Sequence, residues 1–258
     1  MAVNIAVLVK WVPEPQGTPA LGPDHLLVRQ GADGALDPGD EYGLERAIQL
    51  VERDGGDVVV VSMGPEVAVS AVQRALAMGA TRGVLVTDEA LRGADTLVTA
   101  RVLAAAIGSA GPLDLVIAAV ESTDGYTGTL PITVAELLGM PSVTFATSLD
   151  IADGALRAER QTAAGTEHVS APLPALTTVT TGVAEPRYPS LKGVMAAKSK
   201  PIDRPSLADL GLAADEVRPS QTVVGVEAAP AKSGGRVIEA GPDAAGEIAD
   251  LLTEARVI

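Results

Sequence analysis

The chain has no cysteine and only two histidines among its 258 residues. The absence of cysteine excludes disulfides, thiolate metal ligands and cysteine nucleophiles, and it favours neither redox compartment. His25 and His168 have no His or carboxylate neighbour at the spacing of metal ligands. Both are therefore interpreted as surface or strand residues.

Aromatic residues and positive charge are also scarce. Phe, Trp and Tyr make up 2% of the chain, and the formal net charge is -14. A protein that stacks bases or a flavin on its own usually has more rings, and nucleic-acid binding needs a basic surface. Nucleic acid is therefore excluded as a partner. One short basic cluster comprises Lys192, Lys198, Lys200 and Arg204.

The sequence lacks signals for export, membrane insertion and catalysis. Its first residues show no basic stretch with a cleavage site, and no apolar run approaches a membrane span. We therefore expect a cytoplasmic protein without direct membrane insertion. The motifs G-x-S-x-G and H-E-x-x-H, a P-loop lysine and a first-strand G-x-G-x-x-G are also missing. We expect a binding protein without catalytic residues of its own.

Hydrophobic residues, at 47%, suffice for a large buried core, and their order indicates an α/β domain. Apolar, β-branched runs predict buried strands at residues 3–12, 57–62, 83–87 and 114–119. Helical patterns follow from Asp37, Gly64, Ala94 and Leu130. Strands that alternate with helices predict an open, mostly parallel sheet with right-handed crossovers.

The pattern changes beyond residue 141. Short strand-like segments, which we expect to extend the sheet partly in antiparallel fashion, occupy residues 147–151, 156–161, 167–171 and 175–180. The stretch from Gly182 to about Pro242, rich in Pro, Ala and Lys, is interpreted as an arm or linker. A last helix with Ile248, Leu251 and Leu252 needs a surface to pack on. The predicted parts are a core over 1–182, an arm over 183–212, and a linker with the last helix over 213–258.

Ligands of open parallel sheets bind beyond the carboxyl ends of the strands. Three loops qualify here: Lys10–Pro13, Ser62–Pro65 and Val120–Thr129. The third combines hydroxyls, two glycines and a helix start, so its backbone N–H groups can hold a phosphate. A plain turn with Thr129 as helix N-cap explains it equally well. For Ser62–Pro65, an ordinary helix start is preferred to the wall of an adenine pocket.

An acidic group comprises Asp37, Asp40 and Glu41. It could serve a metal ion or acid–base chemistry. Negative residues in a first helical turn, where the helix dipole favours them, explain it with fewer assumptions. No metal site is therefore predicted.

Several motifs, taken in their order along the chain, resemble the beta subunit of electron transfer flavoprotein. The resemblance covers about residues 4–212. The weaker motifs are Val9–Val12, Asp37–Glu45, Ser62–Pro65, Ala75–Ala80, Asp124–Gly128 and Glu159-Arg160. The most specific one is Glu185–Lys198, which reads E-P-R-Y-x-x-L-x-x-x-M-x-A-K.

The resemblance implies a Rossmann-like three-layer α/β fold of the adenine nucleotide alpha hydrolase-like type, with a C-terminal arm and helix. It also implies a heterodimer in which the alpha subunit mainly holds the FAD and the beta subunit binds AMP in a structural role. Such heterodimers carry electrons between flavin dehydrogenases, for example acyl-CoA dehydrogenases, and a downstream acceptor. The residues that the resemblance assigns to the nucleotide are Leu8, Lys10, Asp37, Pro38, Gly39, Asp40, Met63, Val120, Glu121, Asp124, Gly125, Tyr126, Thr127, Gly128 and Thr129, with the phosphate on the last three.

The resemblance further implies that partner dehydrogenases dock on segment 188–200, with Leu191 as the exposed anchor. The residues it assigns to docking are Tyr188, Leu191, Met195, Lys198 and Lys200. Basic charge would steer such an encounter, and one apolar contact would fix the pose. The alternative is a solvated lysine tail with Leu191 folded onto the domain. Where many relatives have aromatic residues near the flavin of the partner subunit, this chain has Pro15 and Gly39.

Two other functions are compatible with the sequence. Some bifurcating relatives hold a second FAD and a nicotinamide site in this subunit instead of AMP, which would make the chain part of an oxidoreductase. The third hypothesis is a stand-alone adenine-nucleotide sensor with a similar sheet. That sensor would need a stable monomer, which the unaccompanied last helix disfavours.

Overall fold

The structure is a computed structural model that describes residues 2–14, 17, 19–29, 31–227 and 235–258. Pro15, one of the two positions at which the chain departs from many relatives, lies outside these residues. The chain forms two compact units, Met1–Val224 and Gly225–Ile258. The first contains the sheet, and the second contains one helix.

Strands and helices alternate through the first half of the larger unit, as the hydrophobic pattern predicts. Its strands are β1 (Ile5–Leu8), β2 (Trp11–Pro13), β3 (Gly34–Leu36), β4 (Val58–Met63), β5 (Arg82–Val86), β6 (Leu115–Ala119), β7 (Ser142–Ala152), β8 (Ala155–Thr162), β9 (Gly165–Pro172), β10 (Ala175–Val179) and β11 (Ile202–Asp203). Its α-helices are α1 (Pro38–Asp54), α2 (Val69–Met78), α3 (Thr96–Ser109), α4 (Leu130–Leu138) and α5 (Leu191–Ala197). Short 3-10 helices occupy η1 (Glu66–Ala68) and η2 (Glu89–Leu91).

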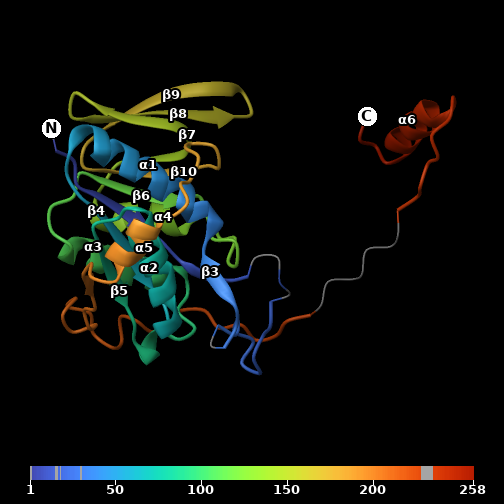
Figure 1. Ribbon diagram of the computed structural model, residues 1–258. Coiled ribbons are helices and arrows are strands. Elements are labelled where there is room, and N and C mark those ends of the chain that lie inside the picture. Colours follow the sequence, from blue (N-terminus) through green and yellow to red (C-terminus); the bar gives the residue numbers. More distant parts are fainter. Residues whose placement is uncertain (1, 15–16, 18, 30, 228–234) are drawn as a thin grey trace. The chain divides into compact units, whose positions relative to one another are not determined.

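Nine strands form one sheet in the order β11-β5-β4-β1-β6-β10-β7-β8-β9 (Figure 1). All neighbours from β11 to β7 are parallel, and β8 and β9 continue the sheet in antiparallel fashion. Ile5 lies opposite Val58 on one side and opposite Leu115 on the other, so β1 is a central strand. The predicted mostly parallel sheet with an antiparallel extension is therefore confirmed.

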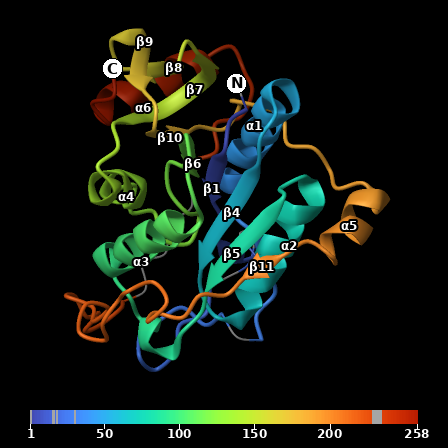
Figure 2. The ribbon, with the colours of Figure 1, turned by 90° about the vertical axis from the view of Figure 1, so that its left-hand side faces the viewer.

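Helices cover both faces of the sheet, which makes the fold a three-layer, Rossmann-like sandwich (Figure 2). Val7 and Val60 pack with apolar residues of α1 and α2. Their neighbours Ala6 and Val59 point to the other face and pack with residues of α3 and α4. This alternation buries all four residues of β1, as a strand covered on both faces requires.

The first strand is shorter than the sequence predicts. It ends two residues before Lys10, and Trp11–Pro13 pairs with Gly34–Leu36 in a separate antiparallel ribbon. The Lys10 N–H donates to the Asp40 carboxylate at 2.8 Å, and the Lys10 carbonyl accepts from the Asp37 N–H at 2.9 Å. The start of α1 thus takes both backbone groups that a longer strand would use.

The segment after β10 differs from the predicted arm or linker. Up to residue 224 it packs on the sheet domain, where β11 adds a parallel strand to the edge at β5. Leu207 and Val217 are buried with the core residues of α3 and α4. The apolar residues of this stretch are unevenly spaced, so no periodic pattern predicts their burial.

The smaller unit contains helix α6 (Ala244–Glu254), which confirms the predicted last helix. Within this described part of the chain, Ile248, Leu251 and Leu252 are exposed. Arg236 forms an ion pair with Glu247 at 2.7 Å in the first turn of the helix. This ion pair joins the segment before α6 to the first turn of the helix.

Candidate functional site

The loops predicted to carry a ligand lie together at one edge of the sheet. Lys10 follows β1, Met63 ends β4, and Val120–Thr129 follows β6. Since β1 pairs in parallel with both β4 and β6, the three loops leave the carboxyl ends of adjacent strands. Open α/β sheets bind ligands at this edge.

Asp37, which is fully buried, ties the start of α1 to the loop after β6. Its carboxylate caps α1 by accepting from the Gly39 N–H at 2.9 Å. It also accepts from the Thr123 N–H at 2.7 Å and from the Thr123 hydroxyl at 3.0 Å. These three donors use the carboxylate as a structural anchor, so Asp37 positions the loop.

Asp40 is buried one turn further along α1. Burial, together with the charge of Asp37, raises the pKa of Asp40 well above its ordinary value. Glu41 instead pairs with Arg74 of α2 at 3.1 Å. Across the described ranges, no group of three or more His, Cys, Asp or Glu side chains is placed to hold a metal ion.

Asp124 is the centre of an ionic network that holds the loop after β6 closed. Its side chain is 8% exposed, lies 2.5 Å from the Lys10 ammonium, and also pairs with Arg29. Lys10 donates to Ser122 at 3.0 Å, and Arg29 donates to the Trp11 carbonyl at 3.2 Å. Burial alone would raise the pKa of Asp124, but the two cations lower it below its ordinary value.

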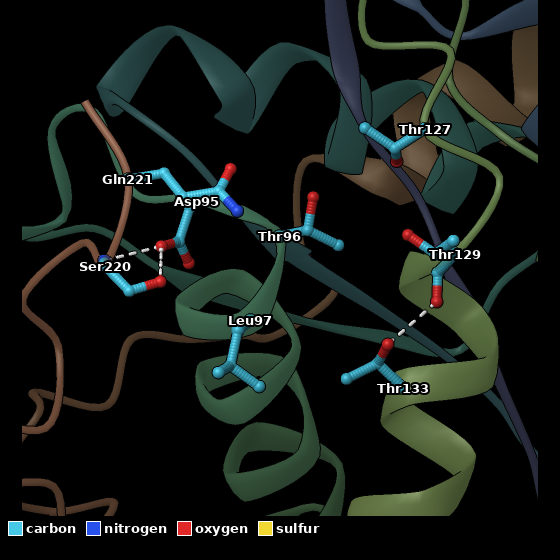
Figure 3. A pocket seen from close by; sticks show the side chains of 8 residues that line it. All are labelled: Asp95, Thr96, Leu97, Thr127, Thr129, Thr133, Ser220 and Gln221. Atoms are coloured by element: carbon cyan, nitrogen blue, oxygen red, sulfur yellow. Dashed lines mark hydrogen bonds between the residues drawn. The ribbon is translucent and has the colours of Figure 1, made fainter. Parts of the chain in front are cut away.

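A cavity of about 510 Å³ lies beside this loop, at the N-terminal ends of α3 and α4 (Figure 3). This size is typical of small-molecule sites. The residues that line it are Asp95, Thr96, Leu97, Thr127, Thr129, Thr133, Ser220 and Gln221. Two of the predicted nucleotide-binding residues, Thr127 and Thr129, are therefore among its walls.

The cavity is rich in hydrogen-bond donors. Thr129 is the N-cap residue of α4, and its side chain makes no capping hydrogen bond within the described residues. Asp95 caps α3 by accepting from the Val98 N–H at 2.9 Å. The Thr133 hydroxyl donates to the Thr129 carbonyl at 2.9 Å. Two helix N-termini and several threonine hydroxyls thus converge on one space. The Asp95 carboxylate in the same lining already accepts hydrogen bonds from Val98 and Ser220, so the remaining donors can serve an anion.

Six of the eight lining residues were not predicted from the sequence. Asp95 and Thr96 carry the ordinary signal of a helix start, an acidic cap before an apolar periodic run, but nothing marks them as ligand residues. Ser220 and Gln221 lie more than ninety residues beyond Thr129 in sequence, in the stretch interpreted as a linker. No local pattern connects them to the cavity.

The other predicted nucleotide-binding residues lie near the cavity's loops without lining it. Leu8 is buried in the core, and Met63 packs partly against the same apolar cluster. Tyr126, with a positive φ, is 68% exposed. Those not yet placed are Pro38 in the first turn of α1, and Val120, Glu121, Gly125 and Gly128 in the loop after β6.

The predicted docking residues gather on and around helix α5. Tyr188, Leu191 and Met195 are 89%, 81% and 59% exposed, and Lys198 is exposed as well. Lys200 instead points inward, and its ammonium donates to the carbonyls of residues 76 and 80 at 2.8 and 2.6 Å. It therefore fixes the end of segment 188–200 to the end of α2.

Arg187 fixes the other end of this segment. Its guanidinium pairs with the buried Glu45 at 2.8 Å and with the exposed Glu52 at 2.6 Å. Hydrogen bonds to Glu52 and Glu45 raise the pKa of Arg187 above its ordinary value. The exposed apolar residues of segment 188–200 are thus presented by an anchored element.

Within the described residues, no helix is both long and apolar enough to cross a membrane. The model of the electron transfer flavoprotein domain matches residues 24–210. That match spans most of the sheet and all of segment 188–200.

Similar proteins cover almost the entire chain. An electron transfer flavoprotein subunit beta of Mycobacterium tuberculosis is 37% identical over 264 residues, which is 99% of each chain. The subunit of the same name from Bacillus subtilis is 36% identical over 88% of this chain and 90% of its own. A caffeyl-CoA reductase-Etf complex subunit, CarD of Acetobacterium woodii, is 33% identical over 99% of this chain and 100% of its own. The chain therefore belongs to the beta-subunit family of electron transfer flavoproteins.

Proposed function

We propose that this electron-transfer subunit binds AMP in the cavity between α3 and α4 and pairs with an alpha subunit that holds most of the FAD. The observation that carries the proposal is the convergence of two helix N-termini with Thr96, Thr127 and Thr129. Free N–H groups and hydroxyls are donors, so the donor set fits a phosphate dianion. FAD supplies the redox chemistry of the heterodimer, and AMP is not consumed.

The ionic network around Asp124 prepares this site without contacting the ligand. Lys10 and Arg29 neutralise Asp124 and hold it between β1 and the ribbon of β2 and β3. Asp37 holds Thr123 in the same loop. The loop is therefore fixed on both sides, and Thr127 and Thr129 stand in place before a nucleotide arrives.

Denaturing the purified heterodimer and counting the released nucleotides tests the proposal. We expect one AMP and one FAD per heterodimer. Thr127→Val and Thr129→Val should each weaken AMP binding about 10- to 150-fold, because a hydrogen bond to a charged group contributes about 1.5–3 kcal/mol. Thr166→Val, which removes a hydroxyl from the exposed face of β9, is the matched control. Unchanged AMP binding in both loop variants would show that AMP does not bind in this cavity.

We also propose that partner dehydrogenases dock on the exposed face of α5, with Leu191 as the anchor. An apolar residue that is 81% exposed and held on an anchored helix fits a brief encounter that one contact dominates. Leu191→Ala should raise the dehydrogenase concentration needed for half-maximal electron transfer about 30-fold, as a 2 kcal/mol hot spot predicts. AMP and FAD content should stay unchanged, and Leu21→Ala, at another exposed leucine, should have no effect.

The similarity to CarD favours one alternative function. The name of that relative places it in a reductase complex, so this chain would then be a subunit of a flavin-bifurcating oxidoreductase with its own FAD and a nicotinamide site. The nucleotide count separates the two functions. Two FAD and no AMP per heterodimer would overturn the electron-carrier function and support the oxidoreductase subunit.

A further inference from the structure

The cavity has a third wall that comes from the far end of the larger unit. Residues 216–221, called the strap here, cross the N-terminal half of α3. Val217 anchors the strap, because its side chain is 1% exposed and packs with the core residues of α3 and α4. Arg101 of α3 donates to the Glu216 carbonyl at 2.5 Å. The strap therefore belongs to the domain although it follows the last strand.

A hydrogen-bonded clasp fastens the end of the strap to the cavity. One oxygen of the Asp95 carboxylate accepts from the Ser220 N–H at 2.6 Å and from the Ser220 hydroxyl at 2.7 Å. Its other oxygen caps α3. Hydrogen bonds from Val98 and Ser220 lower the pKa of Asp95 to about 2, so the clasp stays ionised at neutral pH. Asp95 thus joins the start of α3 to the strap.

The clasp sets where the next side chain lies. Figure 3 shows Ser220 against Asp95, and the side-chain amide of Gln221 extending from the strap toward Thr96. Thr127 and Thr129 line the opposite side of the same cavity. Residues 221–227 are exposed, and Ser220 is the last side chain before them that donates to Asp95.

We propose that Gln221 contacts the bound nucleotide directly and that Asp95 and Ser220 are positioning residues that hold it there. The ligand class, an adenine nucleotide, rests on the proposed function above. The neutral carboxamide offers both a donor and an acceptor without adding charge. Because the oxygens of Asp95 already accept three hydrogen bonds from the chain, its negative charge is partly satisfied and an anionic ligand can lie nearby.

The test measures the release of AMP from the intact heterodimer into an excess of labelled AMP. Gln221→Ala should speed release about 5-fold, which corresponds to one neutral hydrogen bond of about 1 kcal/mol. Ser220→Ala should speed it about 3-fold or more, and Ser220→Thr should restore the slow rate. Gln221→Glu should weaken AMP binding by more than 10-fold and adenosine binding far less, because the new charge opposes the phosphate. A purely structural role would weaken both ligands alike.

A matched control comes from the same segment. Ser206 donates its N–H and hydroxyl to Asp209 at 2.9 and 2.6 Å, which is a Ser–Asp clasp of the same kind away from the cavity. Ser206→Ala should leave release unchanged. A wild-type heterodimer that retains AMP, with release unaltered in the Gln221 and Ser220 variants, overturns this inference alone. A wild-type heterodimer without AMP instead overturns the proposed function on which it rests.

Discussion

The two carboxylates that share the guanidinium of Arg187 allow a controlled test of burial. The Glu45 side chain is 4% exposed, and that of Glu52 is 57% exposed. Glu45 accepts from Arg187 through its N–H, Nε and Nη2 atoms, and also from Gln49 at 2.9 Å. Glu45→Gln keeps the size of the side chain but turns one accepting oxygen into a donor that faces other donors.

The expected loss follows from these exposures. Breaking a fully buried ion pair costs about 3–5 kcal/mol, but Arg187 is 34% exposed and keeps Glu52. We therefore expect Glu45→Gln to lower the free energy of unfolding by about 2–3 kcal/mol. At about 2–4 °C per kcal/mol for a unit of this size, Tm should fall by roughly 5–10 °C. Glu52→Gln breaks a solvent-exposed pair and should cost about 0–1 kcal/mol.

Thermal unfolding followed by circular dichroism measures both losses, and hydrogen exchange locates them. In Glu45→Gln, the Val194 amide, which donates to the Ser190 carbonyl at 2.9 Å in α5, should exchange faster than in the wild type. In Glu52→Gln it should not. Equal losses in the two variants, or an unaltered α5 in both, would refute the argument that the buried carboxylate anchors α5.

The remaining predictions concern charge and close packing. Because the folded-state pKa of Asp40 is raised, its ionisation opposes folding as pH rises above the unfolded value of about 3.8. Asp40→Asn should therefore stabilise the protein at pH 7. Urea titrations should show that this gain vanishes in acid. The ionisation of Asp124 has the opposite effect on stability, because its folded-state pKa is lowered. Its contribution to the free energy of unfolding is complete above the unfolded pKa of about 3.8 and is lost as pH falls through the folded pKa. Asp124→Asn should therefore destabilise the protein at pH 7 and not in acid. Gly193→Ala would place a Cβ 2.3 Å from the Ala77 carbonyl oxygen, and the shift of α5 should cost about 1–3 kcal/mol in unfolding experiments and weaken dehydrogenase docking. Gly108→Ala, in α3 with open space around its Cβ, should instead stabilise by about 0.5–1 kcal/mol, and a loss there would contradict the packing argument.

The sequence by itself determines the sheet and its topology class. Four apolar runs with helical segments between them specify buried parallel strands such as β1 and β6, because burial on both faces leaves a continuous hydrophobic signal. It also specifies where loops leave the strands, and hence the edge at which Thr127 and Thr129 stand. The ordered motifs that end in Glu185–Lys198 indicate the family, which the comparisons confirm.

Only the tertiary structure decides which side chains share a cavity and which pair with other residues instead. Asp124 and Lys10, which the resemblance assigns to the nucleotide, form an ion pair with each other, and Asp124 also pairs with Arg29. Ser220 reaches Asp95 across 125 positions, and Lys200 turns from the predicted docking surface to the end of α2. Such contacts depend on how separate elements pack in space, and a local pattern of hydrophobic residues carries no information about partners so distant in the chain.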